Sequence, residues 1–140
     1  MRLERFKEAQ KQDYETALSE IKSGKKRGHW MWYIFPQIAG LGMTETSRYY
    51  AIKNLDEATA YLQDQELGAR LVNISKALLQ LMTSDPYEIF GTPDDLKLKS
   101  SMTLFDAVPE ASPVFGQVLD KFYQGQRDQK TLALLGKTNA

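Results

Sequence analysis

The sequence contains no cysteine and a single histidine, His29. Without thiols the chain can form no disulfide, no thiolate zinc site and no cysteine nucleophile. One histidine cannot build a multi-histidine metal centre either. We therefore expect no metal site, and the sequence identifies no cofactor.

Long apolar runs are also missing. The longest uninterrupted run, residues 30–35, is far shorter than the roughly 20 residues that a membrane-spanning helix needs. The opening residues, MRLERFKE, carry too many charges for a signal peptide. The sequence therefore predicts a cytoplasmic protein without a membrane partner.

The chain has no excess of charge of one sign. Eighteen Lys and Arg residues balance eighteen Asp and Glu residues, so the formal net charge at pH 7 is zero. A protein that coats nucleic acid relies on a net positive field, which this composition does not provide. The basic cluster in residues 22–27 fits the carboxyl end of a helix. Nucleic acid is therefore not the expected partner.

The composition is that of a folded protein. Hydrophobic residues make up 42% of the 140 residues and charged residues 26%, both close to globular averages. This length supports one domain with its own core. We expect a single domain over residues 1–136 and a frayed tail over residues 137–140.

Two long segments show the spacing of an amphipathic helix, with apolar residues recurring every three or four positions. The first segment runs from Leu3 to Ile21, and Gly24 is placed to end it. The second is built on Leu67, Leu71, Ile74, Leu78 and Leu81.

Side chains that cap helices mark further helix starts. Asp85, Thr92 and Ser112 each precede a proline, the residue favoured at the first helical position. The helix predicted after Pro93 has an apolar set made of Leu96, Met102, Leu104 and Phe105.

Three more helix starts are predicted by capping residues alone. Asn54 with Glu57 resembles a capping box. Thr44 is a candidate cap for a helix running to Ile52, and Asp128 for a last helix that ends at Gly136.

Residues 29–36 are apolar on every side, so periodicity alone does not separate a buried strand from a short helix. A lone strand would leave its backbone groups unpaired, which favours the helix. The sequence thus predicts an all-α fold, a compact single-domain bundle of about six to eight short helices.

Two long blocks, HWMWYIFPQIAGLG at residues 29–42 and FGTPDDLKLKSSMTLF at residues 90–105, carry a family resemblance. Together with residues 50–52, 57–62 and 67–71, they resemble bacterial family 1810 of domains of unknown function. The resemblance implies a small helical domain and no established reaction. The label calpastatin sometimes given to that family does not fit, because calpastatin is a long disordered repeat protein and this chain is compact in composition.

The aromatic block supplies the first candidate site. Six adjacent apolar side chains are usually core, yet the polar tip of Trp32 can reach a pocket wall while its ring packs. Gln37, just after the block, can donate and accept hydrogen bonds. His29, just before it, is a candidate general acid or base, although a lone histidine is more often structural.

The second candidate site involves Lys97. Its spacing from Asp94 allows an ion pair on a helix surface. Alternatively, Lys97 and Ser101 present a cation and a hydroxyl to an anionic ligand, and serine is a poor mid-helix residue. With His29, these two are the candidate catalytic residues. Arg70 lies next to Leu71, outside the apolar stripe of the second amphipathic segment. Its side chain either reaches solvent or binds an anion.

Residues 40–42, Gly-Leu-Gly, lead into the helix expected after Thr44. Glycines permit positive φ angles and close approach, and a helix start exposes unpaired amides that attract anions. Gly42 and Thr44 are therefore candidate ligand contacts, although a plain tight turn explains the same pattern.

These candidates favour a pocket between the aromatic block and the Lys97 helix that binds a small anionic or nucleotide-like ligand, with turnover of that ligand as an open alternative. The proposed ligand contacts are Trp32, Gln37, Gly42, Thr44, Arg70, Lys97 and Ser101. The alternative is a non-catalytic module that binds a protein partner through the basic end of the first helix or an exposed aromatic patch.

Overall fold

The computed structural model describes residues 3–138, and within this range the chain forms nine helices and no strand. The helices are α1 (Glu4–Lys22), α2 (Met31–Ile34), α3 (Glu45–Tyr49), α4 (Leu55–Gln63), α5 (Gln65–Leu79), α6 (Pro86–Phe90), α7 (Asp94–Asp106), α8 (Val114–Tyr123) and α9 (Gln129–Thr138). The predicted all-α class is confirmed. The number of helices is slightly above the predicted six to eight, and α2, α3 and α6 are only four or five residues long. No helix in the described range is long and apolar enough to span a membrane.

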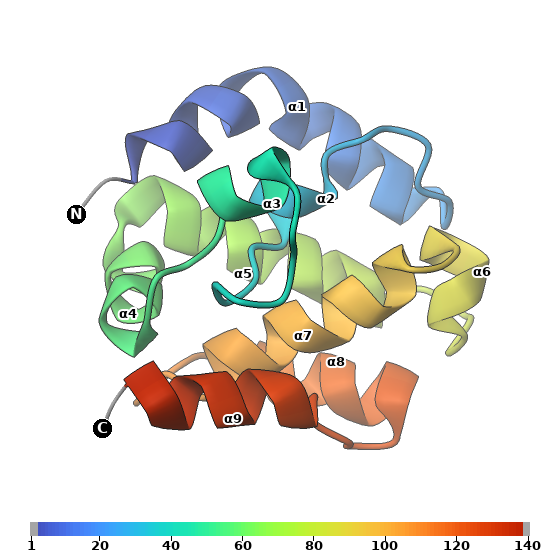
Figure 1. Ribbon diagram of the computed structural model, residues 1–140. Helices are drawn as coiled ribbons and strands as arrows, with labels where there is room; N and C mark the ends of the chain where they lie inside the picture. The colour runs from blue at the N-terminus through green and yellow to red at the C-terminus, as the bar shows by residue number, and fades with distance from the viewer. Residues whose placement is uncertain (1–2, 139–140) are drawn as a thin grey trace.

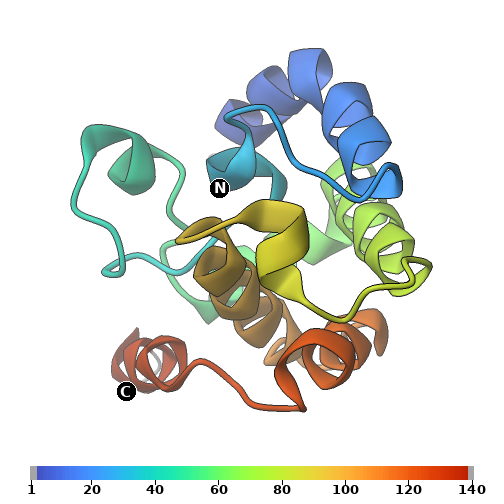
Figure 2. The ribbon, with the colours of Figure 1, turned by 90° about the vertical axis from the view of Figure 1, so that its right-hand side faces the viewer.

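Helix α7 lies in the middle of the fold, between α1 and α2 on one side and α8 and α9 on the other (Figure 1). It packs against α4, α6, α8 and α9, while α5 packs against α1, α4 and α8. Figure 2 shows the segment around α3 extending to one side of this core. A helix covered on most sides needs small or apolar residues around most of its surface.

This central position explains the serines and threonine of α7. Ser100, Ser101 and Thr103 are all buried. The hydroxyl of Ser100 donates to the carbonyl of Leu96 at 3.2 Å, and that of Thr103 donates to the carbonyl of Lys99 at 2.8 Å. Bonding back to the preceding turn satisfies the hydroxyls of Ser100 and Thr103, so these small residues allow close packing. The Ser101 hydroxyl is buried without a hydrogen-bond partner within the described range.

The second amphipathic segment forms the predicted long helix α5. The leucine seam of this helix, Leu67, Leu71, Ile74 and Leu78, is buried. Asp64 caps it by accepting hydrogen bonds from the amides of Glu66 and Leu67, both at 3.0 Å. Leu81 lies beyond the end of the helix.

Four predicted caps are confirmed. Each accepts a hydrogen bond from a backbone amide two or three residues later, at 3.0–3.1 Å. They are Thr44 for α3, Asn54 for α4, Asp85 for α6 and Asp128 for α9. Glu57 does not complete a capping box with Asn54, because its carboxylate accepts from the amide of Lys53 at 2.9 Å.

The starts of α7 and α8 differ from expectation. Pro93 itself occupies the cap position of α7, so Thr92 does not cap it. Pro113 holds the corresponding position before α8, although the Ser112 hydroxyl accepts from the Val114 amide at 3.2 Å. Leu96 was expected in the core and is instead 59% exposed, because it lies in the first turn of α7 at the mouth of a cavity.

Two helices end at residues other than the predicted ones. Helix α3 ends at Tyr49 rather than at Ile52, because Ile52 forms an isolated parallel bridge with Ile38. Helix α9 continues to Thr138, two residues past the predicted end at Gly136. The rest of the expected tail, residues 139–140, lies outside the described residues.

Candidate functional site

Backbone hydrogen bonds to Ile52 hold the first half of the loop of residues 37–42. The Ile52 amide donates to the carbonyl of Gln37, and the Ala39 amide donates to the carbonyl of Ile52, both at 2.8 Å. Gly40 has a φ of +104°, which favours glycine. A Cβ atom at Gly42 would lie 2.4 Å from the Cβ of Ser47, so only glycine lets the loop approach α3 this closely. The loop is therefore preformed.

Helix α2 presents the two tryptophans differently. Trp30 is buried, and its indole N–H donates to Glu20 at 2.9 Å. Trp32 is half-buried, and the ammonium of Lys97 on α7 lies 4.0 Å from the centre of its ring. This is within the range of a cation–π contact. Trp32 and Lys97 therefore join α2 to α7.

Asp94, in the first turn of α7, binds two lysines. Its carboxylate lies 2.8 Å from the ammonium of Lys26 and 3.1 Å from that of Lys97. Burial disfavours the charged carboxylate, but the hydrogen bonds from Lys26 and Lys97 outweigh burial and lower the pKa of Asp94. The three groups together carry one net positive charge.

Two cavities meet at the loop of residues 37–42. The loop cavity, of about 100 Å³, is lined by Trp32, residues 37–42, Ser47, Arg48, Tyr50 and Ala51. The α7 cavity, of about 320 Å³, is lined by Trp32, Gln37, Leu41, Gly42, Pro93, Leu96, Lys97, Ser100, Asp128 and Lys130. Trp32, Gln37, Leu41 and Gly42 belong to both cavities. The α7 cavity has the size of a small-molecule pocket.

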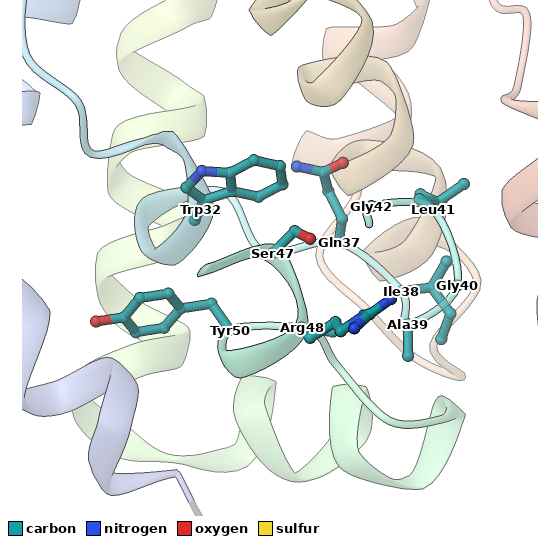
Figure 3. A pocket seen from close by; sticks show the side chains of 11 residues that line it. Trp32, Gln37, Ile38, Ala39, Gly40, Leu41, Gly42, Ser47, Arg48 and Tyr50 are labelled. Atoms are coloured by element: carbon teal, nitrogen blue, oxygen red, sulfur yellow. The ribbon is translucent and has the colours of Figure 1, made fainter. Parts of the chain in front are cut away.

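Gln37 forms part of the wall shared by the two cavities. The residue is 8% exposed, and its Nε2 atom has no hydrogen-bond partner within the described range. Figure 3 shows the amide beside the Trp32 ring. Buried polar groups in proteins are nearly always paired, and leaving one unpaired costs about 1–3 kcal/mol. A hydrogen-bond acceptor in either cavity would satisfy this nitrogen.

Charged side chains at the cavities are mostly cationic. Lys97 and Lys130 line the α7 cavity, and Arg48 lines the loop cavity. The carboxylate of Asp128 is already engaged, because it accepts from the Ser100 hydroxyl at 3.2 Å and from the amide and hydroxyl of Thr131. The electrostatic balance of the site therefore favours an anion.

The family model described as "Protein of unknown function (DUF1810)" matches residues 1–135. The chain belongs to this family. The conserved hypothetical protein Rv1873 from Mycobacterium tuberculosis, whose crystal structure is known, is 46% identical in sequence to this chain. The match covers 96% of each chain, and the two structures superpose with a TM-score of 0.93. No curated protein matches the chain. The family resemblance read from the sequence is thus confirmed, and neither name states an activity.

The DUF1810 fold brings four of the predicted site residues together, namely Trp32, Gln37, Gly42 and Lys97, at the two cavities. Thr44 lies beside them, but its hydroxyl caps α3 by accepting from the Ser47 amide. Its role in the structure is therefore that of a helix cap.

The other three predicted residues do not join this group. Arg70, on α5, pairs with Glu66 at 3.7 Å and lies over the ring of Tyr14. His29 is exposed in the segment before α2. Ser101 is fully buried inside the bundle. None of the three lines either cavity, so the expected grouping of Arg70, His29 and Ser101 with Lys97 does not form.

Sequence reasoning did not single out Arg48, Lys130 and Asp128 as lining residues. Arg48 and Lys130 carry no motif, because a lone basic residue on a short helix is indistinguishable from any solvated residue. Asp128 was identified, but only as a helix cap, which is its role in the structure.

Proposed function

We propose that this protein binds a small anionic or nucleotide-like ligand in the α7 cavity and the adjoining loop cavity. The observation that carries the proposal is the Nε2 atom of Gln37, which is buried without a hydrogen-bond partner in the described range, on the wall between the cavities. Lys97 lines the same cavity and supplies a cation.

Both groups suit a ligand with oxygen acceptors. The Gln37 amide can donate two hydrogen bonds, and a lysine ammonium can donate three. Lys97 is held by Asp94 and Trp32, so little side-chain freedom is lost when it binds a ligand. The site therefore combines a fixed cation with a fixed neutral donor.

The test is a titration of the folded protein with inorganic phosphate and with AMP. Binding is followed by the side-chain amide resonances of Gln37 and by tryptophan fluorescence. Substituting Lys97→Met removes one charge-assisted hydrogen bond of about 1.5 kcal/mol, so we expect about tenfold weaker binding. The matched control is Lys76→Met, an exposed lysine of α5 that lines neither cavity.

Binding that is unaffected by Lys97→Met would contradict the proposal, as would resonances of Gln37 that stay fixed while others move. The alternative is a protein-binding surface at the basic end of α1, where Lys22, Lys25 and Arg27 are exposed. Lys26 is 9% exposed in its side chain and pairs with Asp94. That cation is not available to a partner.

A further inference from the structure

The two cavities differ in what they can hold, and this narrows the ligand class of the proposed site. The loop cavity has a volume of about 100 Å³. A cavity of about 150 Å³ is known to take up benzene, so the loop cavity is too small for an aromatic ring. A carboxylate or a phosphate group is of suitable size.

One face of the Trp32 indole is not free to stack a nucleotide base. The ammonium of Lys97 lies 4.0 Å from the ring centre and therefore covers one face of the indole. A base on that face would have to displace the ammonium from the ring and strain its 3.1 Å contact with Asp94. The favourable ligand leaves Lys97 in place and binds it through an anionic group.

Each of the two cavities has at least one cation in its lining. Lys97 and Lys130 line the α7 cavity, while Arg48 lines the loop cavity. Figure 3 shows the Arg48 side chain extended beside Ile38 and Ala39. Neither Arg48 nor Lys130 forms an ion pair in the part of the chain that the structure describes. Two separate anionic groups on one ligand would satisfy this arrangement.

We propose that the ligand is a small aliphatic dianion, a dicarboxylate or a phosphorylated carboxylic acid, whose two acidic groups bind Lys97 and Arg48 at opposite ends while Gln37 donates to it between them. This rests on the proposed function, since it assigns the ligand class of the same site. The loop cavity is too small for a nucleoside base, so the proposal assigns no contact to one.

The experiment compares acetate, malonate, succinate, glutarate, adipate, inorganic phosphate and AMP as probes of the folded protein. The Gln37 side-chain amide resonances report binding at the shared wall. We expect one dicarboxylate length to bind at least tenfold more tightly than acetate. AMP should bind no more tightly than phosphate.

Two variants test the two ends separately. Arg48→Gln should reduce the preferred dicarboxylate to the affinity of acetate. Lys97→Met should weaken both. Arg27→Gln, which removes an exposed arginine that lines neither cavity, is the matched control and should change neither.

The outcomes separate this inference from the proposed function. If acetate and phosphate bind in a way that depends on Lys97, but Arg48→Gln has no effect or no length is preferred, the dianion assignment is wrong and the anion site stands. Tighter binding of AMP than of phosphate also overturns the dianion. If no probe moves the Gln37 resonances, both are overturned.

Discussion

Replacing Asp94 with asparagine removes the carboxylate that holds two lysines at the start of α7. The exposed fractions of the three side chains are 9% for Lys26, 18% for Asp94 and 22% for Lys97. The ammonium of Lys26 also donates to the carbonyl of Gly28. After the substitution, this nearly buried ammonium keeps the Gly28 carbonyl, the Trp30 ring 5.1 Å away and the electrostatic attraction of Glu20, but it loses its paired carboxylate.

The expected loss of stability lies between two limits. Breaking a fully buried ion pair by removing one partner costs about 3–5 kcal/mol, whereas an exposed pair contributes up to about 1 kcal/mol. The side chains here are mostly but not wholly buried, and two lysines lose the same partner. We therefore expect Asp94→Asn to lower the free energy of unfolding by about 2–3 kcal/mol.

Urea denaturation of the wild type and the variant at neutral pH measures this difference, with the m-value as a check that both unfold alike. Glu8→Gln, at an exposed carboxylate of α1 without an ion pair in the described range, is the control and should change stability by less than about 0.5 kcal/mol. A double-mutant cycle with Lys26→Met should show a coupling of at least about 1 kcal/mol. An Asp94→Asn loss no larger than that of the control would refute the reasoning.

The same pair predicts a dependence on pH. Because the pKa of Asp94 is lowered from its ordinary value of 3.8, its stabilising contribution is complete above that value and is lost as the pH falls through the folded-state pKa. The stability difference between the wild type and Asp94→Asn should therefore be constant near neutral pH and shrink below about pH 4. A difference that grows in acid would contradict this assignment.

Three further predictions concern packing and capping, each measured as a change in unfolding free energy. Gly42→Ala should cost about 1–3 kcal/mol because the added Cβ would lie 2.4 Å from the Cβ of Ser47. Gly136→Ala, in open space on α9, should instead stabilise the protein by up to about 1 kcal/mol. Equal effects of the two substitutions would contradict this prediction. Trp30→Ala should cost about 3–5 kcal/mol and half-buried Trp32→Ala clearly less, and the reverse order would show that Trp32 is the core residue. Asp128→Ala should cost about 1–2 kcal/mol and Asp128→Asn less, and equal losses would mean that the cap hydrogen bond is not the cause.

Local signals in the sequence predicted the helices well where a few neighbouring residues decide the structure. The seam of α5 and the cap at Asn54 are both of this kind, because an apolar stripe and a capping oxygen act within one or two turns. The errors occur where distant residues decide. Ile52 leaves the predicted helix because it pairs with Ile38, and Leu96 is exposed because α7 turns that face toward a cavity.

The carboxylate of Asp94 makes one contact that local spacing predicted and one that depends on a residue distant in sequence. The spacing of Asp94 and Lys97 along the helix predicted their contact, which forms at 3.1 Å. Nothing local indicated that Lys26, far away in sequence, would take the other side of the same carboxylate. An expected exposed surface pair thus became a largely buried three-residue link between the segment after α1 and the start of α7.

The candidate site divides in the same way. Trp32, Gln37 and Gly42 were predicted together because they lie on one short segment, and a chain that bends through a glycine loop keeps its neighbours close. Arg48 and Lys130 come from α3 and α9, and only the tertiary fold brings their helices to that segment. Arg70 illustrates the opposite outcome, since α5 places it against Tyr14, on α1, although its chemistry suits an anion site equally well. The residue types of a binding site can therefore be inferred from sequence only where the chain itself holds them side by side. The cations that decide ligand class depend on helix packing.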